Sequence, residues 1–538
     1  MSTPLFWIAG ITIVACAVAS AQRDEPLSVA ERSGFIETSR YADVRAFLDM
    51  LAMRHPDVHL ETFGRSEEGR ALPLLVIGER DRQRARTPVV LVMANIHAGE
   101  VEGKEATLHL ARRILDGDLK SLRGSATWLL APIYNADGNE KISVDNRTEQ
   151  NGPIAGVGTR ENAKGLDLNR DFMKLESAEA RALVALMTTW DPDVVVDLHT
   201  TNGSYHGYHL TYAPGLNPNT DERITSFTRD RLLSAVRQAM ASRHQFRIFD
   251  YGNFAHVDAL EEELEGFASD DTRQKAWRTF DERPRFGTNY VGLRNRIAIL
   301  SEAYSYLSFE RRVHVTEAFV EEIMRFVAAH AREIRELTSR VDADWSSRAA
   351  TSDGGVAFTL KALPKPVDVL VGAISTTPNP RSGKPMRSMV EHVAIPTRMT
   401  AYDRFAATAS RRVPREYVVH GNSTLVDAVA RALAAHGVHT ERLGATSRRT
   451  ADVFVIDRMT HAARPFQGHR ETSVTGRFER REIEIPSGSL AVKTAQKLGR
   501  LAFYLLEPES NDSLATWNLL DSDLAPGKAH PVLAARVE

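Results

Sequence analysis

The stretch "LVMANIHAGEVEGKEA", residues 91–106, carries the strongest structural signal in the chain. An apolar run ends at Ile96, His97 and Glu100 follow it three residues apart, and a helical pattern begins at Glu102. This order predicts a buried strand, a turn and a helix, with the two polar residues in the turn. A His-x-x-Glu pair is common by chance, so a metal site and a purely structural pair both remain open at this point.

Two later apolar runs end in the same way. "VVVDLH" finishes with His199, and "IAILSE" finishes with Glu302. Because the carboxyl ends of parallel strands share one edge of a sheet, these residues should meet His97 and Glu100 there. Two histidines and a carboxylate are a common ligand set for catalytic zinc, and a second carboxylate can act as general base. We therefore expect zinc on His97, Glu100 and His199, with Glu302 as the base, since unpaired buried charges are costly.

The fold class expected from the pattern is α/β, with a largely parallel sheet flanked by helices. Apolar runs of strand length alternate with helical patterns between residues 41 and 338. The expected strands are 72–78, 88–96, 126–134, 193–199 and 296–302, and the expected helices include 102–117, 177–190 and 316–337.

The chain is long enough for two domains. Residues 341–356 are polar and show no periodicity, so we expect a linker there, between a catalytic domain at 26–340 and a C-terminal domain at 357–538. The second domain is expected to be smaller and to mix α and β, with strands at 367–373 and 451–458 and a helix at 423–438. The sequence assigns it no role.

The N-terminus has the pattern of a secretory signal peptide at residues 1–21. An apolar segment precedes an Ala-x-Ala site that ends at Ala21, which predicts a secreted or periplasmic protein. The alternatives are an uncleaved membrane helix, for which the segment is short, and lipid attachment at Cys16. Cys16 is the only cysteine, so the mature chain would bind a metal only through His, Asp and Glu.

The overall charge is balanced. Lys and Arg number 68 against 70 for Asp and Glu, so no net field favours nucleic acid as a partner. The sequence does not indicate an oligomeric state.

Five motifs together resemble the zinc carboxypeptidases, in a bacterial branch with an additional C-terminal domain. The resemblance covers roughly residues 41–330 and implies a carboxypeptidase-like fold and zinc-dependent removal of C-terminal amino acids from peptides. It rests on "HAGE" at 97–100, "PIYNADG" at 132–138, "GLDLNRDF" at 165–172, "DLH" at 197–199 and "ILSE" at 299–302.

Carried over residue by residue, the resemblance implies the same three ligands and the same base. It further implies that Asp167 hydrogen-bonds His97 and that Asn169 and Arg170 bind the carboxylate of the substrate. The arginine that stabilises the oxyanion would be Arg147, with Arg160 as the alternative.

The tyrosine that closes over the substrate would be Tyr290, with Tyr251 as the second candidate. The residue that sets side-chain preference is not identifiable from the sequence.

Two other functions remain open. The same ligand set serves zinc amidases and deacylases, which would act on cell-wall peptides or N-acyl amino acids. A family member without activity could instead bind peptide or glycan through its second domain. For a carboxypeptidase, and also for an amidase or deacylase, the expected partner is a peptide-like substrate with a free carboxylate.

Overall fold

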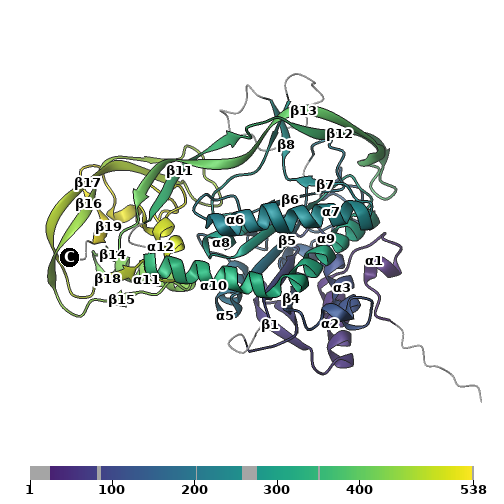
Figure 1. The fold of residues 1–538 in the computed structure, drawn as a ribbon, viewed down its shortest axis with the longest axis horizontal. Helices are drawn as coiled ribbons and strands as arrows, with labels where there is room; N and C mark the ends of the chain where they lie inside the picture. Colours follow the sequence, from purple (N-terminus) through teal and green to yellow (C-terminus); the bar gives the residue numbers. More distant parts are fainter. Residues whose placement is uncertain (1–24, 82–86, 202, 257–274, 349–351, 536–538) are drawn as a thin grey trace, which may run out of the picture.

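The protein is described from a computed structural model, which describes residues 25–81, 87–201, 203–256, 275–348 and 352–535 (Figure 1). The expected signal peptide and Cys16 lie outside these residues. Within them, no helix is both long and apolar enough to cross a bilayer.

The central sheet has eight strands in the order β1-β2-β4-β3-β5-β10-β6-β7. The neighbours β4, β3, β5 and β10 run parallel, β2 and β6 flank them antiparallel, and β1 pairs antiparallel with β2. The expected strands are present as β2, β3, β4, β5 and β10, with ends shifted by one to three residues. The bounds are β1 His59–Arg65, β2 Ala71–Ile77, β3 Val89–Ala94, β4 Thr127–Ala131, β5 Val194–Thr200, β6 Leu210–Pro214, β7 Ile248–Asp250 and β10 Ile297–Ala303.

Both faces of this sheet are buried, which explains why its central strands are continuous apolar runs. In β3, Leu91 and Met93 belong to one hydrophobic cluster, whereas Val90 and Val92 belong to another on the opposite face. Helices α2, α3, α7 and α9 pack on the second face, and α5 and α8 pack on the first.

Helix α5 begins where its sequence suggests. Ser177 caps α5 by accepting a hydrogen bond from the amide of Ala180, as its position in the pattern predicts. The bounds are α1 Val29–Arg32, α2 Tyr41–Arg54, α3 Glu102–Leu115, α4 Ala136–Glu140, α5 Ala178–Trp190, α6 Glu222–Ser226, α7 Ser234–Arg243, α8 Gly287–Leu293, α9 Phe309–Ala329 and α10 Ala331–Arg348.

The residues expected to form a linker are largely ordered secondary structure. Residues 341–348 continue α10, and residues 353–356 belong to β11. The buried side chains Ile334, Thr338, Val341 and Trp345 recur at helical spacing, so α10 packs one face against the protein although its other residues are polar. The expected helix at 316–337 is divided between α9 and α10, which are separated at His330.

The C-terminal region contributes two further sheets. One contains β11 (Asp353–Ala362), β12 (Val367–Pro378) and β13 (Pro385–Arg412) with β8 (Asn253–His256) and β9 (Lys275–Arg278). Its β12–β13 hairpin, residues 367–412, extends over the central sheet as an arm (Figure 1). The other is six-stranded, with β14 Glu416–Val419, β15 Glu441–Arg442, β16 Ser447–His461, β17 Thr472–Ile485, β18 Leu490–Lys493 and β19 Ala529–Ala535, beside α11 Ser423–Ala435 and α12 Gly499–Leu506.

The C-terminal region and the central sheet share one hydrophobic cluster. Leu91 of β3 and Met187 of α5 belong to the same cluster as Val429 of α11 and Leu505 of α12. This continuous core indicates that the two regions unfold together.

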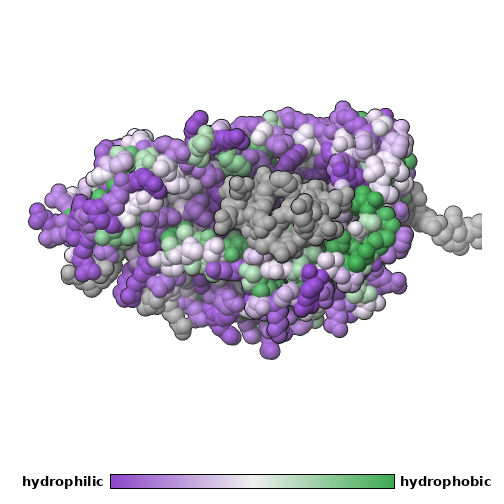
Figure 2. All heavy atoms as spheres, turned by 90° about the horizontal axis from the view of Figure 1, so that it is seen from above, coloured by the Kyte–Doolittle hydropathy of each residue, from purple (hydrophilic) through white to green (hydrophobic). Residues whose placement is uncertain are grey.

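The surface seen in Figure 2 is largely hydrophilic, as expected where side chains meet water.

A buried ion pair fastens the same interface. The guanidinium of Arg285 lies 3.0 Å from Asp512 Oδ1 and 2.6 Å from Glu471 Oε1. Arg285 is 2% exposed and Asp512 is fully buried. Trp517 donates a further hydrogen bond to Asp512 at 2.8 Å, so the buried carboxylate depends on partners from both regions.

We expect Arg285→Ala to lower the free energy of unfolding by about 3–5 kcal/mol, because it leaves the charge of Asp512 buried and unpaired. Chemical denaturation followed by tryptophan fluorescence measures this loss. Arg332→Ala is the control, since the Arg332 side chain is 93% exposed in a surface pair and its loss should cost less than about 1 kcal/mol. Equal free energies of unfolding for the two variants would contradict a stabilising role for the Arg285–Asp512 ion pair.

Candidate metal centre

His97, Glu100 and His199 come together at the carboxyl edge of the central sheet. His97 Nδ1 and His199 Nδ1 each lie 3.1 Å from a different oxygen of Glu100. One ligand atom from each residue lies within 4.8 Å of the other two, and all three side chains are buried. Metal–ligand bonds of about 2.0–2.1 Å in a tetrahedral zinc site place ligand atoms at comparable separations. The donor set therefore fits zinc.

Strand pairing produces this convergence. β5 lies between β3 and β10 and is parallel to both. In the β5–β10 register, His199 stands opposite Glu302. Beyond β3, Asn95 adopts a left-handed conformation with φ 65°, which asparagine tolerates, and the chain turns there toward His97.

The carboxylate of Asp167 orients the imidazole of His97. Asp167 Oδ1 lies 3.0 Å from His97 Nε2, so Nδ1 is left to face Glu100 and a metal. Arg160 donates to the other oxygen of Asp167 at 2.9 Å, and the backbone amide of Asn169 donates to Oδ1 at 2.9 Å. Asp167 therefore contacts the imidazole of His97 and is itself held by Arg160 and the amide of Asn169.

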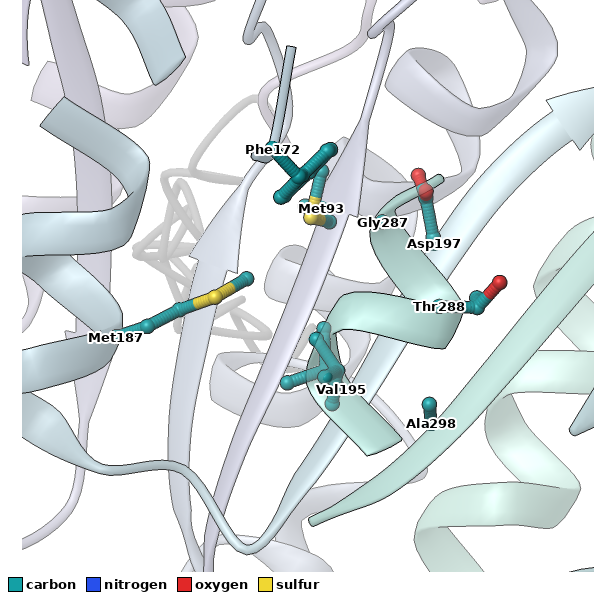
Figure 3. Close-up of a pocket in the computed structure, with 9 residues that line it drawn as sticks. Met93, Phe172, Met187, Val195, Asp197, Gly287, Thr288 and Ala298 are labelled. Atoms are coloured by element: carbon teal, nitrogen blue, oxygen red, sulfur yellow. The ribbon is translucent and has the colours of Figure 1, made fainter. Parts of the chain in front are cut away.

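His199 has an acidic neighbour that the sequence analysis did not identify. Asp197 Oδ2 lies 2.9 Å from His199 Nε2, although the two groups are not aligned as a hydrogen bond. A small apolar gap, too narrow for water, lies beside Asp197 near Gly287 at the start of α8 (Figure 3). The signal was present in the sequence, because residues two apart in a strand point to the same face.

Glu302 has an unusual environment for a carboxyl group. Burial raises its pKa to about 8, the charge of His199 opposes this shift, and the charge of Glu100 adds to it. A bound divalent cation would lower this pKa, because it favours the carboxylate form. Without a cation, burial therefore favours the protonated form of Glu302.

Glu100 is held in its charged form. Burial raises the pKa of its carboxyl, but the positive charges of His97 and Arg147, with hydrogen bonds from both histidines, hold it well below its usual range. A charged carboxylate is the form that binds zinc.

Both candidate arginines for the oxyanion reach this centre. Arg147 Nη1 lies 3.0 Å from Glu100 Oε1, and Arg147 Nε donates to Gln150 at 2.8 Å. Arg160 lies farther from Glu100, at 3.9 Å, and is engaged with Asp167. Arg160 Nη1 also lies 3.4 Å from His97 Nδ1, so both arginines adjoin the candidate ligands, and Arg147 is the one not bonded to Asp167.

Asn169 and Arg170 lie in a single turn of 3-10 helix, Leu168–Arg170, next to Asp167. Asn169 Oδ1 accepts a hydrogen bond from the amide of Gly287 at 2.8 Å, so its side chain is fixed against the start of α8. The guanidinium of Arg170 lies over the ring of Phe286 at 3.9 Å. This stacking fixes the plane of a group suited to two-pronged carboxylate binding.

Tyr290 does not lie at this centre. It is fully buried, packs against Phe172, and its hydroxyl lies 2.9 Å from His436 Nδ1 in the C-terminal region. Tyr251, the second candidate, lies near the ligands instead. Burial and the charges of Glu302 and Glu100 raise the pKa of its phenol.

A cavity of about 360 Å³ adjoins Arg147. It is open on one side and has a mixed polar lining formed by Asp145, Arg147, Thr148, Glu149, Gln150, Thr201, Gly203, Ser305 and Tyr306. Thr201 and Ser305 follow the ends of β5 and β10, so the cavity extends from the edge of the sheet that carries the ligands.

Comparison with known proteins gives a consistent set of relatives. Residues 44–281 match a family described as zinc carboxypeptidase. Carboxypeptidase 2 of Trichophyton rubrum is 23% identical over 479 residues, which is 85% of this chain and 79% of that protein. Carboxypeptidase M of Mus musculus is 32% identical over 136 residues, or 24% of this chain and 29% of that protein.

Solved structures give a weaker overall likeness. A metallo-carboxypeptidase from Burkholderia cenocepacia has a TM-score of 0.38 and 18% identity, and the match covers 54% of this chain and 69% of that one. Carboxypeptidase A from Helicoverpa armigera has a TM-score of 0.39 and 17% identity, covering 55% and 75%.

We expect His97→Ala to abolish zinc binding, because a buried carboxylate and one histidine remain as ligands. Elemental analysis by mass spectrometry after dialysis measures the zinc content. His209→Ala is the control: His209 is also buried, but it bonds Glu391 and the amide of Arg247, outside the ligand set. Full zinc occupancy in His97→Ala, or its loss in folded His209→Ala, would contradict the ligand assignment.

Proposed function

We propose that this chain, which matches a zinc carboxypeptidase family over residues 44–281, is a metallocarboxypeptidase that removes amino acids from the C-terminus of peptides. The observation that carries the proposal is the position of Glu302, one strand away from His199 and in register with it. A base beside an open metal site is the arrangement that hydrolysis of an amide bond requires.

Zinc, when bound by His97, Glu100 and His199, supplies a Lewis acid that activates water and polarises the scissile carbonyl. Glu302 accepts the proton of the attacking water on its carboxylate. It then gives that proton to the amine nitrogen of the leaving amino acid, so one residue acts as base and then as acid.

Arg147 stabilises the negative charge that develops on the carbonyl oxygen of the substrate. Its contact with Glu100, at 3.0 Å, keeps the guanidinium next to the ligand set before substrate arrives. A fixed cation at that oxygen favours the transition state over the ground state. Arg160 serves the metal side instead, through its bond to Asp167.

Asn169 and Arg170 bind the terminal carboxylate of the peptide. This contact would select the last residue of the chain, because an internal peptide bond offers no carboxylate at that position. The remainder of the peptide would occupy the cavity beside Arg147, which is bordered by Thr201 and Tyr306.

Tyr251 takes the role first assigned to Tyr290, closing over the bound residue. Its phenol lies close enough to Glu302 and Arg170 for their charges to affect its pKa. Asn253 donates to its hydroxyl at 3.1 Å, and this bond orients the group.

Export of the protein is also part of the proposal, and it is supported by the N-terminal sequence pattern alone.

The proposal is tested with defined peptides supplied either with a free or with an amidated C-terminus, and digestion by the zinc-loaded protein is followed by mass spectrometry. Stepwise trimming is expected for the free acids only, because amidation removes the charge that Arg170 binds. Glu302→Gln should keep zinc and lose about 10²–10⁴-fold in rate. Equal trimming of both sets would exclude carboxylate capture, and trimming of neither would favour the amidase alternative.

The two tyrosines are expected to behave differently when the hydroxyl is removed. Tyr251→Phe should raise KM or lower kcat/KM for free-acid peptides by about tenfold, the effect of losing a hydrogen bond to a bound substrate. Tyr290→Phe should leave both constants unchanged and lower the free energy of unfolding by about 1 kcal/mol through loss of the His436 contact. Steady-state kinetics and denaturation measure the two effects, and a kinetic defect in Tyr290→Phe alone would reverse the assignment.

A further inference from the structure

Two parts of the C-terminal region touch segments that bear proposed active-site residues. The first is the tight turn Phe466–His469, called here the 466–469 turn. The second is the part of the arm (residues 367–412) that surrounds the start of strand β13. Neither contact follows from the zinc carboxypeptidase match, which ends at residue 281.

The 466–469 turn presents Gln467 to Asp167. Gln467 Oε1 accepts a hydrogen bond from the backbone amide of Asp167 at 2.9 Å, across 300 residues of sequence. Gln467 and Gly468 both have positive φ, 49° and 83°, and Phe466 pairs with His469 across them. These angles are those of a tight hairpin turn, which holds the residue at its tip in a defined direction.

The turn is fixed on both sides. His469 Nε2 lies 2.7 Å from Glu176 Oε1 of the catalytic region, and His469 Nδ1 lies 2.9 Å from Asn518 Oδ1. Phe466 packs on the shared hydrophobic cluster and lies under the guanidinium of Arg285 at 5.4 Å. Gln467 is thus held by contacts other than its own bond to Asp167.

Asp167 is the point at which this contact can affect the metal and the substrate together. Its side chain bonds His97, and the same oxygen accepts the amide of Asn169. Fixing the backbone of Asp167 therefore fixes the orientation of a zinc ligand and the start of the segment that carries Asn169 and Arg170.

The arm holds the loop that carries Arg147. Lys384 Nζ lies 2.6 Å from Asp145, and Arg387 lies 2.7 Å from the carboxylate of Glu149. The amide of Arg387 also donates to the carbonyl of Glu149 at 2.9 Å. These contacts flank Arg147 on both sides in sequence.

The backbone of Arg147 has a conformation that neighbouring contacts must hold. Its φ of 48° lies in the left-handed region, where a residue that bears a side chain is strained. The surrounding structure must therefore hold that conformation, and the arm supplies bonds to its neighbours Asp145 and Glu149.

We propose that the C-terminal region completes the active site, with Gln467 as the positioning residue for Asp167 and Arg387 as the positioning residue for Arg147. The part that concerns Arg147 rests on the proposed function. The part that concerns Gln467 rests on the zinc ligands alone. The C-terminal region is accordingly a component of the catalytic unit, because it positions residues of the active site.

The Gln467 contact is tested in the full-length chain by zinc affinity, measured by competition with a chromogenic chelator. Gln467→Ala should weaken zinc binding by about tenfold, the lower end of the effect of losing support behind a metal ligand. Gln467→Glu should restore affinity, because a carboxylate also accepts the bond from the Asp167 amide. Arg470→Ala, an exposed change next to the turn, is the control and should bind zinc as the wild type does. Wild-type affinity in Gln467→Ala would overturn the assignment.

The Arg387 contact is tested by two readouts. Arg387→Ala should lower kcat on free-acid peptides by about 10- to 100-fold at unchanged zinc affinity, because a small displacement of Arg147 weakens oxyanion stabilisation. It should also speed hydrogen exchange in residues 145–150, and Arg387→Lys should partly restore both values. Arg398→Ala is the control, since Arg398 pairs with Asp368 on the exposed part of the arm.

The two readouts separate this inference from the proposed function. If the wild type trims no peptide, the proposed function fails, while zinc affinity and hydrogen exchange still test the two contacts. Unchanged exchange and unchanged kcat in Arg387→Ala would overturn the role of Arg387. Denaturation curves accompany each variant, and a loss of zinc affinity in Gln467→Glu equal to that in Gln467→Ala would also contradict the account.

Discussion

The parallel pairing of β5 with β3 on one side and β10 on the other is the constraint on which the site depends. It brings His199 into line with Glu302 and places both beside the turn that carries His97 and Glu100. A shift of one residue in either register would turn the side chains to the opposite face of the sheet. The apolar side chains of both faces hold the register, because each face packs against helices or the C-terminal region.

The charges at this edge make sense only as a group. Glu100 contacts His97, His199 and Arg147, and Asp167 contacts His97 and Arg160. Isolated charges of this number would be costly to bury, whereas a divalent cation shared by two histidines and a carboxylate offsets that cost.

The sequence predicts the strands and the polar residues that meet at the sheet edge well, because both follow from local patterns: an apolar run, then a polar residue where the strand ends. It separates Tyr251 from Tyr290 poorly, since an aromatic residue near a glycine has the same local pattern in a core and at a site. It misses Gln467 because that contact joins residues 300 positions apart. It misses the C-terminal half of α10 because the buried stripe of Val341 and Trp345 is diluted by serine and aspartate.

The central claim is that one zinc ion binds where β3 and β5 end. Anomalous diffraction at the zinc edge, from crystals of the zinc-loaded protein, tests it most directly. The account predicts a single strong peak between His97, Glu100 and His199, with the carboxylate of Glu302 facing the open side. A principal peak at the other group able to hold a metal among the described residues, His244, Glu321 and Glu322, with none at the sheet edge, would contradict it.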